Sequence, residues 1–96
     1  IMSSTGGFPL NNYKHFYEFL RLQIHSYRSR HSFTQERMAE ILHISARSYF
    51  DQEHGKYGFS SPTFAFFLLN LSEEEVLRLL KDARTVLEGR NENDIR

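Results

Sequence analysis

Apolar side chains recur at steps of three and four residues along most of this chain, which is the spacing of one face of an α-helix. The clearest series consists of Tyr13, Phe16, Tyr17, Leu20, Ile24 and Tyr27. This series predicts a helix over 13–30. No segment sustains the alternation of apolar and polar residues that a half-buried strand requires. The pattern therefore predicts an all-α fold.

The starts of the following helices are marked by residues that suit an N-cap, whose side-chain oxygen accepts a hydrogen bond from the first turn. Three of them are flanked by apolar residues spaced for a hydrophobic staple: Thr34, Ser45 and Ser72. Ser61 with Pro62 marks a further start, because proline suits the first helical position. Gly55 and Gly89 suit helix C-termini. These signals predict four further helices, over 34–42, 45–54, 62–71 and 72–88.

These elements divide the chain into one folded domain and two ends. Residues 1–12 are rich in Ser, Gly and Asn, and we interpret them as a flexible arm. Residues 13–89 are predicted to form a compact five-helix domain that includes the C-terminal helix, and 90–96 a disordered tail. A chain of 96 residues is long enough to bury a single modest core.

The composition narrows the possible functions. The absence of cysteine excludes disulfides, a thiolate nucleophile and Cys-containing zinc sites. The longest apolar run spans only 64–69, whereas a membrane-spanning helix needs about 20 apolar residues. We therefore expect a cytoplasmic protein with no membrane partner and no cofactor. Twelve basic and twelve acidic side chains cancel, so the chain lacks the basic excess typical of nucleic-acid binders.

The second and third predicted helices are short and are separated by only a few residues. Such a pair cannot pack antiparallel over a useful length, so it must cross at a steep angle, and Ala39 supplies the small side chain that close crossing needs. Apolar residues on either side fill the wedge between the helices: Met38, Leu42, Ile44 and Tyr49. This arrangement is typical of a helix-turn-helix, whose second helix presents its N-terminal residues to the DNA major groove.

A longer pattern accompanies this helix pair. Residues 33–45 are Phe-Thr-Gln-Glu-Arg-Met-Ala-Glu-Ile-Leu-His-Ile-Ser. They resemble the Cro/repressor-type (XRE) helix-turn-helix family, whose pattern is an apolar residue, Ser/Thr-Gln, two variable residues, Leu-Ala, and a turn ending in an apolar residue and Ser/Thr. Residues 53–56, Glu-His-Gly-Lys, are similar to the Glu-x-Gly-Lys/Arg that closes the family's third helix. The resemblance covers about 20–71, and it implies a compact repressor-like domain with a central helix-turn-helix.

The chain departs from the family pattern at three places. His43 stands at the turn position that usually holds glycine, and Gln52 stands where the family usually has an apolar residue. A histidine can adopt the left-handed backbone conformation, but less readily than glycine. The segment 55–62 is longer than the usual link to the fourth helix.

The resemblance implies a set of DNA contacts. Gln35 would bond a phosphate together with the free N–H groups of its helix N-terminus. Arg47 can take guanine O6 and N7 in a bidentate contact, and Lys56 would meet a phosphate flanking the groove. The remaining candidates lie along the third helix: Ser45, Ala46, Ser48, Phe50 and Asp51. The alternative for all of them is an ordinary solvated face.

The resemblance also implies that Arg28 and Glu53 pair, which would tie the first helix to the end of the third. A bidentate Arg–carboxylate pair fixes geometry as well as charge. We expect this pair to be structural rather than part of the DNA contact.

Several other chemistries find little support in the chain. The five histidines follow no recognised metal-ligand spacing. The Gly-x-x-Gly at 55–58 matches the loop of KH domains, but those domains need a sheet. No nucleophile–base pair or phosphate-cradling loop stands out, so we do not expect an enzyme.

The last helix carries an apolar stripe at helical spacing: Val76, Leu79, Leu80, Ala83 and Leu87. It predicts a homodimer whose two recognition helices lie about 34 Å apart, one turn of DNA. The alternative is that this helix folds back as a lid on a single core.

We therefore expect a sequence-specific DNA-binding transcriptional regulator of prokaryotic or phage type, with double-stranded DNA as its partner. The alternative is a protein–protein interaction module, for example an antitoxin-like partner, that keeps the fold with weak or no DNA binding. The neutral charge and the single basic residue within 46–53 favour this alternative.

Overall fold

The computed structural model describes residues 10–88, which contain five helices and no strand. The helices are α1 (Leu10–Arg30), α2 (Gln35–Leu42), α3 (Ala46–Glu53), α4 (Ser61–Leu69) and α5 (Glu73–Glu88). The all-α fold predicted from the apolar spacing is confirmed. The predicted arm is too long, because α1 already begins at Leu10, one turn before Tyr13. The rest of that arm, Gly89 and the predicted tail at 90–96 lie outside the described residues.

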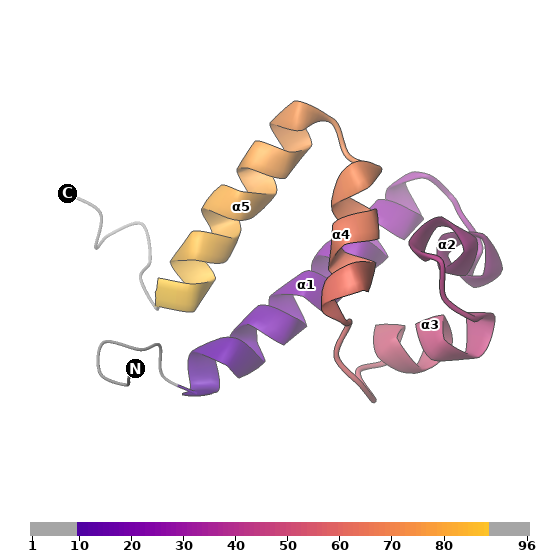
Figure 1. Ribbon diagram of the computed structural model, residues 1–96, viewed down its shortest axis with the longest axis horizontal. Helices are drawn as coiled ribbons and strands as arrows, with labels where there is room; N and C mark the ends of the chain where they lie inside the picture. The colour runs from indigo at the N-terminus through magenta and orange to yellow at the C-terminus, as the bar shows by residue number, and fades with distance from the viewer. Residues whose placement is uncertain (1–9, 89–96) are drawn as a thin grey trace.

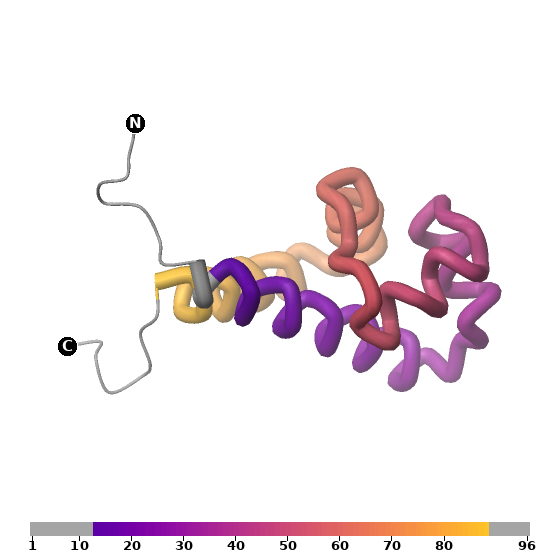
Figure 2. Tube along the Cα trace, turned by 90° about the horizontal axis from the view of Figure 1, so that it is seen from below, coloured from indigo at the N-terminus to yellow at the C-terminus, as the bar shows by residue number. Residues whose placement is uncertain are grey.

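The helices are arranged around α1, the longest of them (Figure 1). α5 runs back along α1 at one end of the molecule, α2 and α3 lie at the other end, and α4 crosses between the two groups. Figure 2 shows that α1 and α5 form one layer, with α2, α3 and α4 rising on one side of it. This arrangement leaves one long side of α3 facing away from the other helices.

One core joins all five helices. Its buried members are Leu20, Ile24, Tyr27, Met38, Ala39, Leu42, Tyr49, Phe59, Phe67 and Leu79. Ala39 is buried where α2 meets α3, with Met38, Leu42 and Tyr49 around it, as the sequence predicts. The rings of Tyr27 and Phe67 meet edge to face, with centroids 5.6 Å apart, which holds α4 against α1.

Three of the predicted caps are confirmed. Thr34 Oγ1 accepts from Arg37 N, and Ser45 Oγ accepts from Ser48 N, both at 3.0 Å. Ser72 forms a reciprocal capping box, because its N donates to Glu75 Oε1 at 2.8 Å and its Oγ accepts from Glu75 N at 3.1 Å.

The cap of α4 lies one residue earlier than predicted. Ser60, in extended conformation, accepts from Thr63 N at 3.3 Å, so Ser61 is already helical and Pro62 sits in the first turn. Proline is tolerated there because the N–H groups of the first turn have no partner within the helix. The other end of α4 also comes earlier, since the helix stops at Leu69 and Asn70 caps it.

α2 and α3 end in the same way, with a left-handed residue and two backbone hydrogen bonds that close the last turn. His43 has φ 62° and ψ 40°, and Ile44 N donates to Ala39 O at 3.0 Å. Gly55 has φ 84°, and Lys56 N donates to Asp51 O at 2.8 Å. This is the Schellman arrangement. The histidine at the turn between the two helices therefore adopts the left-handed conformation that a glycine usually provides there.

The apolar stripe predicted on α5 does not lie on one outward face. Leu79 and Ala83 are only 4% and 6% exposed, because α5 packs with this side on α1. Their prediction as dimer contacts is therefore wrong. Leu80 is 46% exposed, and Val76 and Leu87 are half-buried. The spacing groups residues that share one broad face of α5, but α1 covers the middle of that face.

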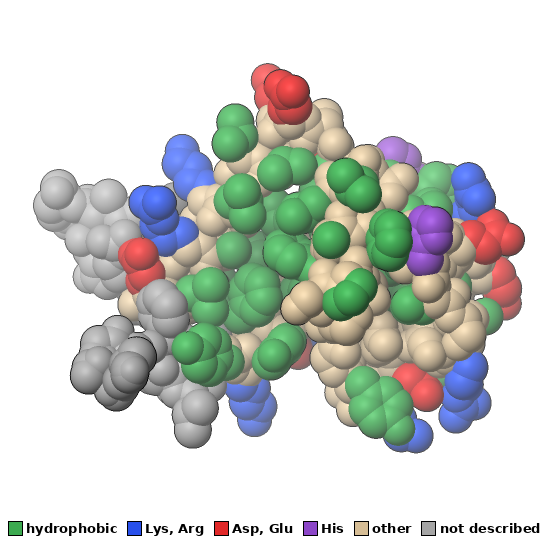
Figure 3. Space-filling view, viewed as in Figure 1, with side chains coloured by type: hydrophobic (Ala, Val, Ile, Leu, Met, Phe, Trp, Pro, Cys, Tyr) green, Lys and Arg blue, Asp and Glu red, His purple; other side chains and the backbone are tan. Residues whose placement is uncertain are grey.

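Apolar side chains gather over α1, α4 and α5 in the middle of the side of the molecule seen in Figure 3. This apolar surface includes a hollow of about 440 Å³ between these helices, lined chiefly by aromatic rings. The lining residues are Tyr13, Phe16, Tyr17, Leu20, Phe59, Ser60, Ser61, Phe64 and Leu87.

Candidate nucleic-acid interface

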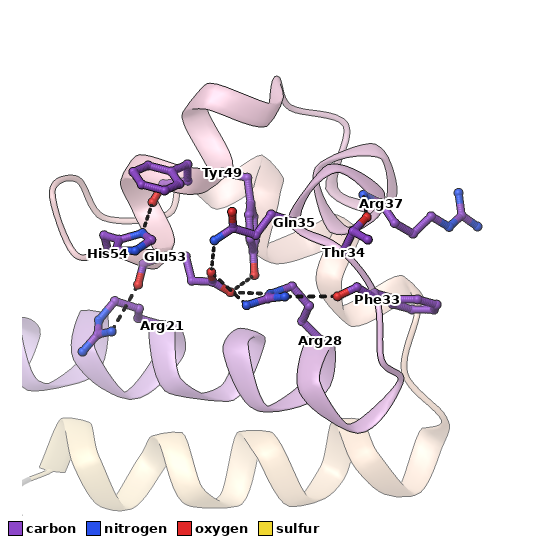
Figure 4. Close-up of polar contacts among 10 residues, drawn as sticks. Arg21, Arg28, Phe33, Thr34, Gln35, Arg37, Tyr49, Glu53 and His54 are labelled. Carbon is purple, nitrogen blue, oxygen red and sulfur yellow. Dashed lines mark hydrogen bonds and ion pairs between the residues drawn. The ribbon is translucent and has the colours of Figure 1, made fainter.

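The inner side of α3 is fixed to the rest of the domain by Glu53, the last residue of the helix (Figure 4). Arg28 of α1 donates to its carboxylate through Nε (2.6 Å to Oε2) and Nη2 (3.2 Å to Oε1). The predicted Arg28–Glu53 pair is thus confirmed, and it is bidentate. Arg28 Nη1 also donates to the carbonyl of Phe33 at 3.1 Å, so the same guanidinium holds the segment that leads into α2.

Two further side chains donate to the same carboxylate. Tyr49 Oη lies 2.6 Å from Oε2, and Gln35 Nε2 lies 2.7 Å from Oε1. Arg21 Nη1 donates to the backbone carbonyl of Glu53 at 3.2 Å. We call Arg28, Gln35, Tyr49 and Glu53 the Glu53 cluster. It connects α1, α2 and α3 at one point, so the angle between α2 and α3 is set by charged hydrogen bonds as well as by packing.

The electrostatics of the Glu53 cluster keep Glu53 ionised. Burial by itself would raise the pKa of Glu53, whose side chain is 5% exposed. The hydrogen bonds from Arg28, Tyr49 and Gln35 outweigh this effect and lower its pKa below the ordinary value of 4.5. The hydrogen bond to Glu53 in turn raises the pKa of Arg28, and burial raises that of Tyr49. A carboxylate that is ionised at neutral pH and accepts hydrogen bonds from three side chains ties the segments that carry those side chains together.

The outer side of α3 is exposed and lightly held. The side chain of Arg47 is 77% exposed, and its Nε donates to Asp51 Oδ2 at 3.3 Å. Its guanidinium also lies 6.0 Å from the ring centroid of Phe50. Phe50 is 43% exposed, and its ring stacks on that of His54 with centroids 4.1 Å apart. These contacts engage the Nε and one face of the Arg47 guanidinium, and its two terminal nitrogens make no hydrogen bond within residues 10–88.

The structure brings some of the predicted DNA contacts together and separates others. Ser45, Ala46, Arg47 and Phe50 are all exposed at the start and middle of α3. Ser48 is half-buried. The side chain of Asp51 is only 13% exposed and pairs with Arg47, which leaves it poorly placed to meet a base.

Gln35 and Lys56 belong to two other segments, the first turn of α2 and the turn that follows α3. Gln35 is half-buried, and its amide nitrogen donates to Glu53. An amide nitrogen carries two hydrogens, so one N–H of Gln35 remains for a phosphate. Lys56 is exposed just after Gly55, with Nζ 5.5 Å from the ring centroid of Tyr57.

The sequence did not reveal the roles of Tyr49 and Gln35 in the Glu53 cluster. Tyr49 was predicted as an apolar wedge between α2 and α3, and its ring is fully buried there. Its spacing of four residues from Glu53 was the available signal, because such residues share a helix face. Gln35 lies 18 residues from Glu53, and nothing in the local pattern links the two.

Among residues 10–88, no three His, Asp or Glu side chains gather as a metal site would require, and none of the helices is long and apolar enough to cross a membrane. No family model, curated protein or solved structure matches the chain.

Proposed function

We propose that this protein binds double-stranded DNA through α3 and acts as a transcriptional regulator of the Cro/repressor (XRE) type. The observation that carries the proposal is the combination of a rigidly held inner side and an exposed outer side on one short helix. The Glu53 cluster holds α3 against α1 and α2, while Arg47, exposed over 77% of its side chain, stands on the outer side near the N-terminus of the helix. A helix presented in this way suits the major groove.

Arg47 is the residue we expect to contact a base. Its Nε is engaged by Asp51, which aligns the guanidinium plane and leaves the two terminal nitrogens for a ligand. Guanine O6 and N7 accept such a pair of donors, and a bidentate contact of this kind discriminates against other bases by about 1–3 kcal/mol. Phe50 and Ala46 offer apolar contact to a neighbouring thymine methyl.

Phosphate contacts would flank this base contact on both sides. The second N–H of Gln35 is available at the start of α2, and Lys56 follows α3. Both belong to the groups that position a protein on the duplex without reading its sequence.

The experiment is a titration of labelled duplex of random sequence, followed by selection of bound sequences from the same pool. We expect binding that weakens roughly tenfold or more between about 50 and about 200 mM salt, because each phosphate contact releases counterions. We also expect the selection to enrich a short common motif. Absence of binding at the lower salt concentration would contradict the proposal.

A second candidate function is protein–protein interaction without DNA binding. It is favoured by the zero net charge and by the apolar surface over α1, α4 and α5 (Figure 3). The same titration separates the two functions, because a pure interaction module would leave the duplex unbound even at low salt.

A further inference from the structure

The outer side of α5 carries four residues in one line along the helix axis: Glu73, Leu77, Leu80 and Arg84. Steps of four, three and four residues keep them on one side of the helix. All four are exposed, and Leu77 and Leu80 are 68% and 46% exposed. We call these four residues the α5 stripe. It lies on a different side of α5 from Leu79 and Ala83, which face α1.

The α5 stripe is complementary in charge and apolarity to a second copy of itself that runs in the opposite direction. An acid stands at the start, two leucines in the middle and a base at the end, placed evenly about a point between 78 and 79. A second stripe running antiparallel about that point sets each Glu73 opposite an Arg84 and each Leu77 opposite a Leu80. A parallel copy would instead place like charges together at both ends.

The flanking charges repeat this complementarity. Glu74 and Lys81 lie beside the α5 stripe, seven residues apart and on the same side of it. In the antiparallel arrangement Glu74 of one copy comes next to Lys81 of the other, as flanking charges do in paired helices. The opposite flank holds the half-buried Val76.

These charges have no opposite charge to satisfy them within the part of the chain that the structure describes. None of Glu73, Glu74, Lys81 and Arg84 makes an ion pair within 4.0 Å among residues 10–88. The helix dipole favours acids at the start of α5 and bases near its end. It gives no reason for two exposed leucines midway between them.

We propose that a second copy of this chain covers the α5 stripe, with the two α5 helices antiparallel about a two-fold axis that passes between 78 and 79. Such an interface is isologous, so each contact occurs twice. α5 and α3 lie at opposite ends of the molecule (Figure 1), so the dimer carries its two α3 helices on its outer sides. The pairing is independent of the proposed DNA binding and is measured without DNA.

The test is sedimentation of the full chain at about 10 μM, a range in which a micromolar dimer is populated. We expect the wild type to be a dimer and Leu80→Glu to be a monomer, with helix content unchanged because Leu80 is exposed. Glu73→Arg and Arg84→Glu, each alone, should weaken the dimer by roughly tenfold, since each replaces two attractive contacts by two repulsive ones. Asp82→Arg, an exposed reversal on the side of α5 away from the stripe, is the matched control and should leave the dimer intact.

Mixing the two charge variants tests the geometry by comparison with the wild type: antiparallel stripes regain the wild-type affinity in the mixture, whereas parallel stripes would make the mixture bind more tightly than the wild type. Glu73→Arg leaves a stripe with two basic ends, and Arg84→Glu leaves one with two acidic ends. An equimolar mixture should therefore form heterodimers about as tight as the wild-type dimer. A monomeric wild type would overturn the proposal, and so would a dimer that survives Leu80→Glu or charge variants that fail to associate on mixing.

Discussion

The two sides of α3 differ in almost every physical respect although they belong to the same eight residues. On the inner side, Tyr49 and Glu53 are buried and their polar atoms are bonded within the domain. On the outer side, Arg47 and Phe50 are exposed and are held only by neighbours one turn away. The inner side fixes where the helix stands, and the outer side is left free to meet a ligand.

This contrast implies that stability and recognition can be changed separately. Substitutions on the inner side should lower the free energy of unfolding, because buried hydrogen-bond partners are costly to remove. Substitutions on the outer side should change DNA binding and leave unfolding nearly unaltered, because exposed side chains contribute little to stability.

The largest effect on stability is expected from Arg28→Ala. It leaves the buried carboxylate of Glu53 without its ionic partner, and breaking a buried pair on one side costs about 3 kcal/mol or more. Urea unfolding at neutral pH measures the change. Arg37→Ala is the matched control, because Arg37 pairs with Glu40 at the surface with both side chains more than half exposed, and it should cost about 0.5 kcal/mol or less. Equal losses from the two variants would mean that the Glu53 cluster does not stabilise the fold.

Tyr49→Phe should have the next largest effect. It removes only the hydroxyl that donates to Glu53 and keeps the buried ring in place. A hydrogen bond to a charged group contributes about 2 kcal/mol, so the free energy of unfolding should fall by about that amount. Affinity for DNA should change little at a temperature where the variant is fully folded. A Tyr49→Phe variant as stable as the wild type would show that packing alone holds this side of α3.

The smallest effect expected on the inner side of α3 is a change of folding stability with pH. The pKa of Glu53 is lowered in the folded protein, so its charge stabilises the fold above the unfolded value of about 4.5 and this contribution is lost as pH falls further. The stability advantage of the wild type over Glu53→Gln should therefore be constant from pH 7 to about pH 5 and shrink below it. An advantage that grows on acidification would contradict the assigned direction.

The parts of this molecule that the sequence predicted are those governed by local chemistry. Thr34, Ser45 and Ser72 could be recognised as caps because an N-cap acts within its own first turn. The Arg28–Glu53 pair came from the resemblance of the chain to a family pattern, not from spacing.

The sequence could not predict the contacts for which a side chain has two possible partners. Leu79 and Leu80 are adjacent and equally apolar, but only Leu79 is buried, because the position of α1 decides which side of α5 is covered. Gln35 was predicted to bind phosphate and its amide donates to Glu53, a contact that exists only once α2 and α3 have crossed. Such alternatives are decided by the packing of whole helices.

The central claim is that the outer side of α3 recognises DNA. Its most direct test is the binding of a selected duplex to the wild type and to Arg47→Ala, followed by fluorescence anisotropy, with Arg78→Ala on α5 as a control that removes the same charge from another helix. We expect Arg47→Ala to weaken DNA binding by about 1–3 kcal/mol and to relax the sequence preference at one base pair. Its free energy of unfolding should stay within about 0.5 kcal/mol of the wild-type value. Arg78→Ala should bind as the wild type does. Equal affinities for the wild type and Arg47→Ala, with the same preferred sequence, would contradict the claim.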